Sequence, residues 1–585
     1  MRKTTLCDQC NEIFTGLLWP TLRPVRYLWV ILPLLFSLLA NATALPPQAA
    51  IATAHPLATR AGQQILQAGG NAFDAAVAVT AALGVVEPYG SGLGGGGFWL
   101  LHRNSDGFQT MVDGREKAPL AAYRDLYLDD HGNVIPGASI DGPLAAGIPG
   151  VPAAMVHIAE KYGRLPLAKS LAPAIRLARE GFEIDEHYRR YAKMRLKTLQ
   201  QFPSTARIFL QNNEVPALGY RLKQPDLANT LESIALHGTA DFYTGALAKR
   251  LVDAVKKSGG IWSLDDLKNY RVVEREPIRS NYRGMKLISA SLPSSGGIAL
   301  ASMLQMLSQY DLTKMTNVDQ VHLTVEVMRR AYRDRAEYLG DSDFVTVPVA
   351  RLISSQHAKQ LVANIHMDQA TPSEELNPAG NPTGAGSDTT HFSILDKDGN
   401  RVAATMSVNF LFGSCFVAPG TGFLLNDEMD DFSAKPGVPN VYGLVGTAAN
   451  AIAPGKRPLS SMSPTFLEND RGVAILGTPG GSRIISMILL AALKYEQGGE
   501  AVDLVELPRF HHQYLPDMIM YEEGAFPEAT EQELELRGHI LKKQMSPYDG
   551  GIGHYGNMQA VVWDKQKNKV TAASDSRGIG LAITD

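Results

Sequence analysis

A long run without any core-forming pattern most constrains how this chain can fold. Residues 369–388, QATPSEELNPAGNPTGAGSD, are rich in proline and glycine and carry no helical or alternating apolar pattern. Such a segment predicts an exposed loop. It leads directly to Thr389 and Thr390, and HFSILDKDGNRVAATMSVN then alternates around Asp398-Gly399, which predicts a β-hairpin. The exposed loop therefore leads directly into a predicted strand, at whose start lie the carboxyl group of Asp388 and the hydroxyls of Thr389 and Thr390.

Helical and strand patterns are both plentiful elsewhere, but they do not alternate as regular βαβ units. Residues 50–86 are alanine-rich and helical in pattern, with a break at Gly69-Gly70 and a stop near Pro88. Further helical blocks cover residues 145–251 and 318–363, whereas GVAILGTPGGSRII predicts a strand entering a glycine turn and MQAVVWDKQKNKVTAASD a second hairpin. The simplest architecture is one large α+β domain whose helices cover antiparallel sheet.

The glycine-rich stretch GSGLGGGGFWLLH contains the spacing G-x-G-x-x-G at Gly92, Gly94 and Gly97. A dinucleotide loop needs a strand before this motif and a helix after it. Here a predicted helix comes first and an apolar strand follows, so the stretch does not indicate nucleotide binding.

The first 44 residues resemble a secretory leader. Basic residues precede an apolar run over residues 27–40, which is shorter than the roughly 20 residues needed to span a bilayer. Ala42-Thr43-Ala44 matches an A-x-A cleavage site, although an uncleaved membrane anchor is the alternative. Cys7 and Cys10 lie inside the leader, so the exported chain would keep only Cys415 and no internal disulfide.

Composition and missing motifs exclude several classes of protein. A formal net charge of -4 with 19% charged residues favours neither nucleic acid nor an anionic membrane surface. The chain has no H-E-x-x-H, no P-loop and no G-x-S-x-G elbow. His511 and His512 are adjacent and cannot both face one ion from a regular element, so we interpret them as structural and expect no metal site.

The remaining candidates suit recognition of an amino acid and acyl transfer. Arg115 follows an Asp-Gly turn and could bind a carboxylate bidentately. The stretch LLNDEMDDFS could hold an ammonium group, but a solvated acidic turn is equally compatible with it. KRPLSSMSPT supplies the hydroxyls of Ser460 and Ser461, and Gly480 and Gly481 stack backbone N–H groups suited to an oxyanion.

These motifs together resemble one family. GSGLGGGGFWL, DGREKAP, PSSGGIAL, DTTHFSILDKDGN, LLNDEMDDFSAKPG, KRPLSSMSPT, TPGGSRII and PRFHHQYLPD occur in this order, as in bacterial γ-glutamyltranspeptidases. The resemblance covers nearly the whole chain after residue 50. It implies an N-terminal-nucleophile hydrolase with a four-layer αββα sandwich, made from a zymogen that cuts itself.

The resemblance also assigns roles to individual residues. Cleavage between Asp388 and Thr389 would make Thr389 the nucleophile and the new N-terminus, giving a signal peptide (1–44), a large subunit (45–388) and a small catalytic subunit (389–585) that form a heterodimer. The remaining family roles are an assisting hydroxyl (Ser407), an α-carboxylate clamp (Arg115, Ser460, Ser461), α-amino contacts (Asn409, Glu428, Asp431) and an oxyanion hole (Gly480, Gly481).

Two positions depart from the family pattern, and one segment distinguishes γ-glutamyltranspeptidases from acylase-like relatives. Ser407 stands where a threonine is usual, and Glu428 stands where bacterial relatives often carry glutamine; both keep the required chemistry. Residues 436–458 resemble the lid over the γ-glutamyl site, with Tyr442 as its anchor. Acylase-like relatives often lack this segment.

The predicted function is transfer of the γ-glutamyl group of glutathione and related compounds to water, amino acids or peptides, without metal or cofactor. The alternative within the fold is a cephalosporin or glutaryl acylase. An alternative from another class is a periplasmic amino-acid-binding protein, which would use the same charged residues without cutting itself. The leader predicts the periplasm of a Gram-negative bacterium, or a membrane-tethered form if the leader is kept.

Overall fold

The computed structural model describes residues 44–376, 389–545 and 553–585. The predicted leader, apart from Ala44, and Asp388 of the predicted cleavage site therefore lie outside the described residues, as does most of the predicted exposed loop. Residues 46–585 form one compact unit. No helix among the described residues is both long enough and apolar enough to cross a membrane.

The strands of this unit run as follows: β1 (Ala50–Thr53), β2 (Gly96–Arg103), β3 (Phe108–Asp113), β4 (Phe182–Glu183), β5 (Arg221–Leu222), β6 (Val273–Arg275), β7 (Ile278–Tyr282), β8 (Met285–Ser289), β9 (Thr390–Leu395), β10 (Arg401–Ser407), β11 (Thr465–Asn469), β12 (Gly472–Gly477), β13 (Phe510–His511), β14 (Ile519–Tyr521), β15 (Leu541–Lys543), β16 (Gln559–Asp564), β17 (Lys569–Ser574) and β18 (Leu581–Thr584).

The α-helices are α2 (Pro56–Gln67), α3 (Ala72–Val86), α4 (Val151–Tyr162), α5 (Leu167–Glu180), α6 (Glu186–Gln201), α7 (Pro203–Phe209), α8 (Pro225–His237), α9 (Ala240–Tyr243), α10 (Ala246–Lys257), α11 (Leu264–Lys268), α12 (Gly296–Leu307), α13 (Asn317–Tyr338), α14 (Val349–Leu352), α15 (Ser355–Val362), α16 (Ile484–Glu496), α17 (Ala501–Val505) and α18 (Glu528–Leu536). Short 3-10 turns include η4 (Glu428–Asp431) and η6 (Gly481–Arg483).

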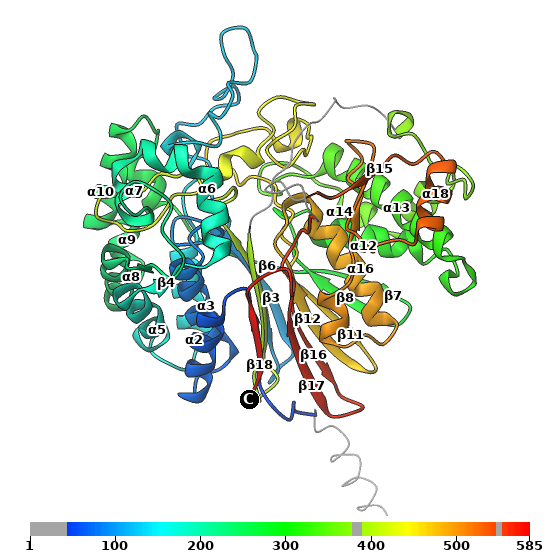
Figure 1. The fold of residues 1–585 in the computed structure, drawn as a ribbon, viewed down its shortest axis with the longest axis horizontal. Coiled ribbons are helices and arrows are strands. Elements are labelled where there is room, and N and C mark those ends of the chain that lie inside the picture. Colours follow the sequence, from blue (N-terminus) through cyan, green and yellow to red (C-terminus); the bar gives the residue numbers. More distant parts are fainter. Residues whose placement is uncertain (1–43, 377–388, 546–552) are drawn as a thin grey trace, which may run out of the picture. The chain divides into compact units, whose positions relative to one another are not determined.

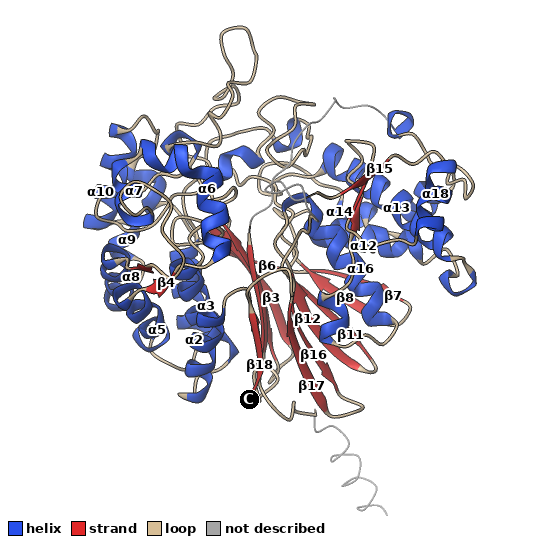
Figure 2. Cartoon of the chain, in the orientation of Figure 1, coloured by secondary structure: helices blue, strands red, loops and turns tan. Residues whose placement is uncertain are grey.

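Two large sheets form the centre of the unit. One has seven strands in the order β18-β1-β9-β10-β2-β3-β6, and the other has six in the order β17-β16-β12-β11-β8-β7. Helices α2, α3, α5 and α8 lie outside the first sheet, whereas α12 and α16 cover the second, with α13 packed against α12 (Figures 1 and 2). The predicted α+β class and four-layer αββα sandwich are confirmed.

Local sequence explains the elements nearest the site. The alanine-rich helix α3 starts at a capping box in which Asn71 and Asp74 exchange hydrogen bonds, and almost every residue of the helix is buried. The predicted hairpin is formed by β9 and β10, which pair antiparallel from Leu395 with Arg401 to Thr390 with Met406. The breaks at Gly69-Gly70 and before β2 also fall where the sequence predicted them.

Other parts of the prediction were wrong or incomplete. Residues 50–53, predicted as helix, form β1, which lies between β18 and β9 in the seven-stranded sheet. All four residues of β1 are buried, so the sequence shows no alternation of apolar and polar residues there. Its two alanines also resemble the alanine-rich sequence of the helices that follow. The strands β6, β7, β8 and β18 were not predicted either.

The two predicted subunits share both sheets. Strands from before and after the 388–389 junction pair with each other in the seven-stranded sheet, since β1 lies between β9 and β18, and β10 pairs with β2. In the other sheet β8 pairs with β11. Backbone hydrogen bonds therefore join the two predicted chains along both sheets.

Candidate active site

Thr389 lies immediately before β9, and its hydroxyl oxygen is buried without a hydrogen-bond partner among the described residues. The Thr390 hydroxyl has a different environment, because successive side chains of a strand point to opposite faces. It donates to Glu87 Oε2 at 2.7 Å. The two hydroxyls of the threonine pair are thus separated, one in a cavity and one in the packing around α3.

Ser407 ends β10, the strand next to β9. Met406 pairs with Thr390, so the next position outward places Ser407 beside Thr389. The Ser407 hydroxyl accepts a hydrogen bond from the Asn409 backbone N–H at 2.7 Å. Asn409 has a left-handed backbone with a φ of 77°, and its side chain donates to the Asp427 carbonyl at 3.1 Å.

The glycine stretch predicted not to bind nucleotide allows close backbone contacts at this edge. A Cβ atom on Gly94 would lie 1.9 Å from the Leu424 carbonyl oxygen, and one on Gly95 would lie 2.0 Å from that of Ser407. Only glycine fits such approaches. The stretch thus permits the loop after α3 to lie against the strand that carries Ser407.

Arg115 follows β3 and is fully buried. Its guanidinium donates to Glu428, to Asp431 Oδ2 at 2.5 Å and to the Pro458 carbonyl at 3.2 Å. Burial raises the pKa of the Glu428 and Asp431 carboxyls, whereas the Arg115 charge lowers it. Arg115 therefore joins the predicted carboxylate clamp to the predicted ammonium site through direct ion pairs.

Ser460 and Ser461 enter the cavity just before β11. The Ser460 carbonyl accepts hydrogen bonds from the Ser295 backbone N–H at 2.8 Å and from its hydroxyl at 2.7 Å. Arg335 of α13 donates to the Ser461 hydroxyl at 3.3 Å and to the Ser295 hydroxyl at 3.0 Å. Sequence reasoning missed Arg335, because an arginine in a helical block gives no local signal of burial.

Gly480 and Gly481 connect β12 to η6 and α16, with φ values of 142° and 56°. Their position at the start of these turns favours negative charge, because helix N-termini present unpaired N–H groups. Gly481 lines the cavity, whereas Gly480, which precedes it in the chain, is not part of the lining. A Cβ atom on Gly481 would lie 2.4 Å from the Tyr442 ring, so a side chain there would displace that tyrosine.

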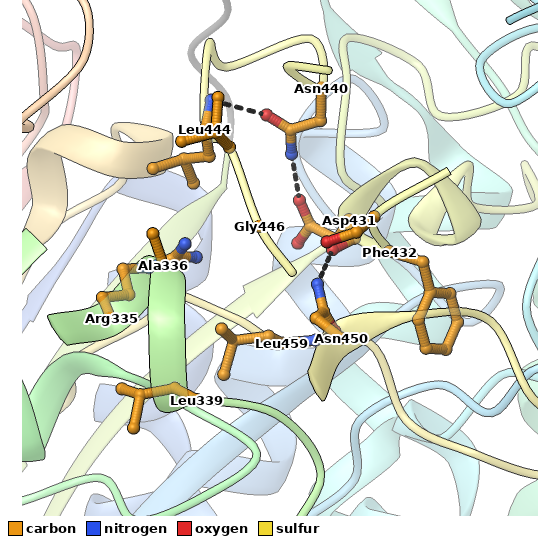
Figure 3. A pocket seen from close by; sticks show the side chains of 12 residues that line it. Arg335, Ala336, Leu339, Asp431, Phe432, Asn440, Leu444, Gly446, Asn450 and Leu459 are labelled. Carbon is orange, nitrogen blue, oxygen red and sulfur yellow. Dashed lines mark hydrogen bonds between the residues drawn. The ribbon is translucent and has the colours of Figure 1, made fainter. Parts of the chain in front are cut away.

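The predicted lid segment, residues 436–458, contributes Tyr442 and Leu444 to the lining of the cavity. The Tyr442 hydroxyl donates to the Asn409 carbonyl at 2.6 Å, and Asn440 donates to Asp431 Oδ1 at 3.0 Å (Figure 3). Gln513 holds the segment from the other side by donating to the Gly443 carbonyl at 3.1 Å.

One cavity is lined by almost all the predicted residues. Its lining comprises Arg115, Thr389, Ser407, Asn409, Glu428, Asp431, Tyr442, Leu444, Ser460, Ser461, Met462, Gly481 and Ile484. The structure thus brings together residues that are far apart in the sequence, while the chemical role of each stays a prediction.

His511 and His512 lie away from this lining and are fully buried. His511 hydrogen-bonds Ser486 at 2.7 Å, and His512 hydrogen-bonds Asp517 at 3.1 Å. The part of the chain that the structure describes contains no cluster of three or more metal-ligating side chains.

Comparison with known proteins decides the family. The γ-glutamyltranspeptidase family model matches residues 58–584. The chain belongs to the γ-glutamyltranspeptidase family. It is 44% identical to a glutathione hydrolase proenzyme from Pseudomonas sp. (strain A14), with 83% of this chain and 85% of the relative covered. It is 43% identical to the glutathione hydrolase proenzyme of Escherichia coli (strain K12), with 85% and 87% covered.

Solved structures agree on the fold of this γ-glutamyltranspeptidase family member. A cephalosporin acylase from Bacillus halodurans superimposes with a TM-score of 0.79 at 28% identity, covering 92% of this chain and 96% of the other. The family and the enzyme class predicted from the motifs, a glutathione hydrolase and γ-glutamyltransferase, are confirmed.

Proposed function

We propose that this protein cuts itself between Asp388 and Thr389, and that Thr389 then transfers the γ-glutamyl group of glutathione and related γ-glutamyl compounds. The observation that carries the proposal is the Thr389 hydroxyl, buried without a partner beside the cavity that also holds Arg115, Glu428 and Asp431. A buried polar group without a partner is costly, so its retention suggests a chemical role.

Self-cleavage would begin with attack of the Thr389 hydroxyl oxygen on the carbonyl carbon of Asp388. The C–N bond breaks, the acyl group moves to oxygen, and the nitrogen takes up the proton that the hydroxyl loses and becomes the α-amine of Thr389. Water then hydrolyses the ester and releases the Asp388 carboxylate. This shift uses the same hydroxyl as the later catalysis, and it also creates the general base.

The catalytic cycle would use both new groups. A free α-amine has a pKa of about 8, so it can accept the hydroxyl proton of Thr389 as the oxygen attacks the γ-amide carbonyl. The N–H groups of Gly480 and Gly481 would stabilise the oxyanion. The amide C–N bond then breaks, the proton passes to the leaving amine, and water or an amino acid or peptide amine attacks the resulting γ-glutamyl ester.

The charged side of the cavity would select the acyl group. An α-ammonium group suits Glu428 and Asp431, and an α-carboxylate suits Arg115 with the hydroxyls of Ser460 and Ser461. A glutaryl group has no ammonium to neutralise two buried carboxylates. This argues for a γ-glutamyl donor over the acylase alternative, which the Bacillus halodurans structure otherwise supports.

Electrophoresis under denaturing conditions with N-terminal sequencing of each band tests the processing step. We expect two bands, the smaller beginning Thr-Thr-His-Phe-Ser, and hydrolysis of a γ-glutamyl anilide well above that of the matched glutaryl anilide. A fully active single chain would falsify the processing step. Faster turnover of the glutaryl anilide would instead support the acylase.

We also propose that the protein works in the periplasm. The proposal rests on the leader pattern of residues 1–44, which lie almost wholly outside the described residues. Fractionation of a Gram-negative host should release γ-glutamyl hydrolase activity with the periplasmic contents. Activity that stays with washed membranes would indicate the tethered form, and activity in the cytoplasm would contradict export.

A further inference from the structure

Arg335 is a buried cation beside the cavity that forms no ion pair within 4.0 Å among the described residues. The residue is 6% exposed, and its guanidinium donates to two neutral hydroxyls, those of Ser295 and Ser461. The Asp431 carboxylate interacts with it electrostatically but from a greater distance. A guanidinium remains protonated in proteins, so a permanent charge is in direct contact with neutral groups here.

The contrast with Arg115 is clear from the contacts. Arg115 pairs with Glu428 and Asp431, and Glu116 Oε2 lies 3.7 Å from the same guanidinium. Its charge is therefore paired with carboxylates of the protein itself. Both arginines contact the segment that carries the serine pair, since Arg115 donates to the Pro458 carbonyl and Arg335 donates to the Ser461 hydroxyl.

A second pocket shares Asp431 and Leu444 with the cavity and is also lined by Arg335, Asn440 and Asn450. Figure 3 shows Arg335 and Leu339 on one side of it and Asp431 with its two asparagine partners on the other. Asn440 donates a hydrogen bond to the Asp431 side-chain oxygen Oδ1, and Asn450 donates to the Asp431 backbone carbonyl. Arg335 thus reaches Ser461 from outside the substrate cavity.

We propose that Arg335 is a positioning residue that supplies the counter-charge for the α-carboxylate of the donor, acting through the Ser461 hydroxyl. The hydroxyl accepts from Arg335 and can therefore direct its own proton toward a carboxylate in the cavity. A hydroxyl polarised by a cation is a stronger donor than an isolated one. This inference rests on the proposed function and deepens it.

The arrangement then fits a zwitterion. Arg115, Glu428 and Asp431 line the place where the α-carbon of a γ-glutamyl group would lie, and Arg335 reaches it through the Ser461 hydroxyl. The carboxylate of the donor would accept from the hydroxyl that Arg335 polarises, and the ammonium would be received by Glu428 and Asp431. The ligand class is an acyl donor with both groups on one carbon.

The test compares two anilides in the processed enzyme. One carries the γ-glutamyl group, and the other carries 4-aminobutyryl, which has the same chain and amine but no α-carboxylate. Arg335→Gln should raise KM for the γ-glutamyl anilide about tenfold to a hundredfold, with kcat within about threefold, because a charge-assisted contact is lost. Turnover of the 4-aminobutyryl anilide should change by less than about threefold. Arg335→Lys, which keeps the charge, should restore part of the preference.

Arg333→Gln is the matched control. Arg333 lies on the same helix and pairs with Glu337 at 3.0 Å, away from the serine pair, so both anilides should react as with the unaltered enzyme. The inference is overturned if Arg335→Gln keeps a normal KM, or if it weakens turnover of both anilides equally.

Electrophoresis distinguishes failure of the proposed function from failure of this inference. A wild-type protein that stays uncut contradicts the proposed function, whereas a cut and active enzyme with an indifferent Arg335→Gln variant contradicts only this inference. If Arg335→Gln does not accumulate, Ser461→Ala and Ser460→Ala test the inference instead. Of the two serine hydroxyls, that of Ser461 accepts from Arg335, so Ser461→Ala should raise KM for the γ-glutamyl anilide at least about threefold more than Ser460→Ala does. Equal effects of the two substitutions overturn the inference.

Discussion

The two walls of the cavity differ in whether their groups form ion pairs. On one wall Arg115 forms buried ion pairs with Glu428 and Asp431, donates to the Pro458 carbonyl, and leaves only one oxygen of Glu428, Oε1, hydrogen-bonded, while Asn440 donates to Asp431. On the other wall the Thr389 hydroxyl has no partner among the described residues. We call the side with the ion pairs the paired wall and the side with the Thr389 hydroxyl the reactive wall.

This difference separates recognition from chemistry. Breaking a buried ion pair leaves an uncompensated charge, so changes on the paired wall should affect both stability and substrate binding. A change at the Thr389 hydroxyl removes no ion pair and should affect chemistry alone. The following substitutions test that separation.

Thr389→Ala should have the largest effect. It removes the nucleophile for self-cleavage and for acyl transfer, so we expect one uncut chain without detectable γ-glutamyl hydrolysis and with a nearly normal melting temperature. Thr389→Ser keeps the hydroxyl and should still cut, although more slowly. Electrophoresis, an anilide assay and thermal unfolding measure the three properties. A strongly lowered melting temperature would show that this wall is structural as well.

Arg115→Met should come next and should affect both properties of the paired wall. We expect KM for a γ-glutamyl anilide to rise about tenfold to a hundredfold, with self-cleavage largely intact. The free energy of unfolding should fall by roughly 3–5 kcal/mol, because Glu428 and Asp431 lose their buried cation.

The matched control for this substitution is Arg164→Met. Arg164 forms an exposed ion pair with Asp398 at 2.7 Å, so its loss should change neither KM nor stability appreciably. An Arg115→Met protein with normal KM would remove Arg115 from donor recognition.

Tyr442→Ala should have an effect of intermediate size. The lid tyrosine packs against Gly481 and donates to the Asn409 carbonyl. Self-cleavage should remain, and the ratio of hydrolysis to transfer should change about twofold to tenfold as water gains access to the ester. Tyr442→Phe keeps the ring and should give a smaller change. The ratio is measured with saturating acceptor dipeptide. An unchanged ratio in both variants would show that residues 436–458 only connect their neighbouring elements and do not shield the ester from water.

Glu87→Gln should have the smallest effect and concerns the packing behind the reactive wall. Burial raises the pKa of Glu87 from 4.5 to about 7, although hydrogen bonds from Thr390 and Tyr89 oppose the shift. The folded state therefore keeps a proton that the unfolded state loses, so stability falls as pH rises from about 4.5 to about 7.

The glutamine variant cannot lose a proton and should lack this decline, which we expect to be on the order of 2 kcal/mol. Denaturant unfolding at several pH values measures the slope. A substitution at the exposed Glu180 should leave the slope as in the wild type. Equal slopes for Glu87→Gln and the wild type would contradict a protonated Glu87.

Local patterns predicted the parts of the fold whose signals are local. Asp398-Gly399 predicted the β9–β10 hairpin, and the Gly69-Gly70 break predicted the end of α2. The role of β1 was not visible, because its position between β9 and β18 depends on strands more than 300 residues away.

The candidate site was predictable as a set of residues but not as a set of contacts. Arg115 and Asp431 are recognisable from their motifs, yet their ion pair joins positions 316 residues apart. Arg335 and Glu87 were missed for the same reason. Each looks like an ordinary helical residue, and only tertiary packing gives it a buried environment and a partner near the cavity.

The pairing of strands from both predicted subunits in each of the two large sheets has a consequence for the order of the folding reaction. A single precursor chain folds in a first-order process, with all its strands tethered together. After cleavage the same strand pairs must form between two separate molecules, so recovery from denaturant becomes second order and depends on concentration. The mature enzyme would then keep its structure chiefly through slow unfolding, and a dilute molecule that once came apart would rarely reassemble.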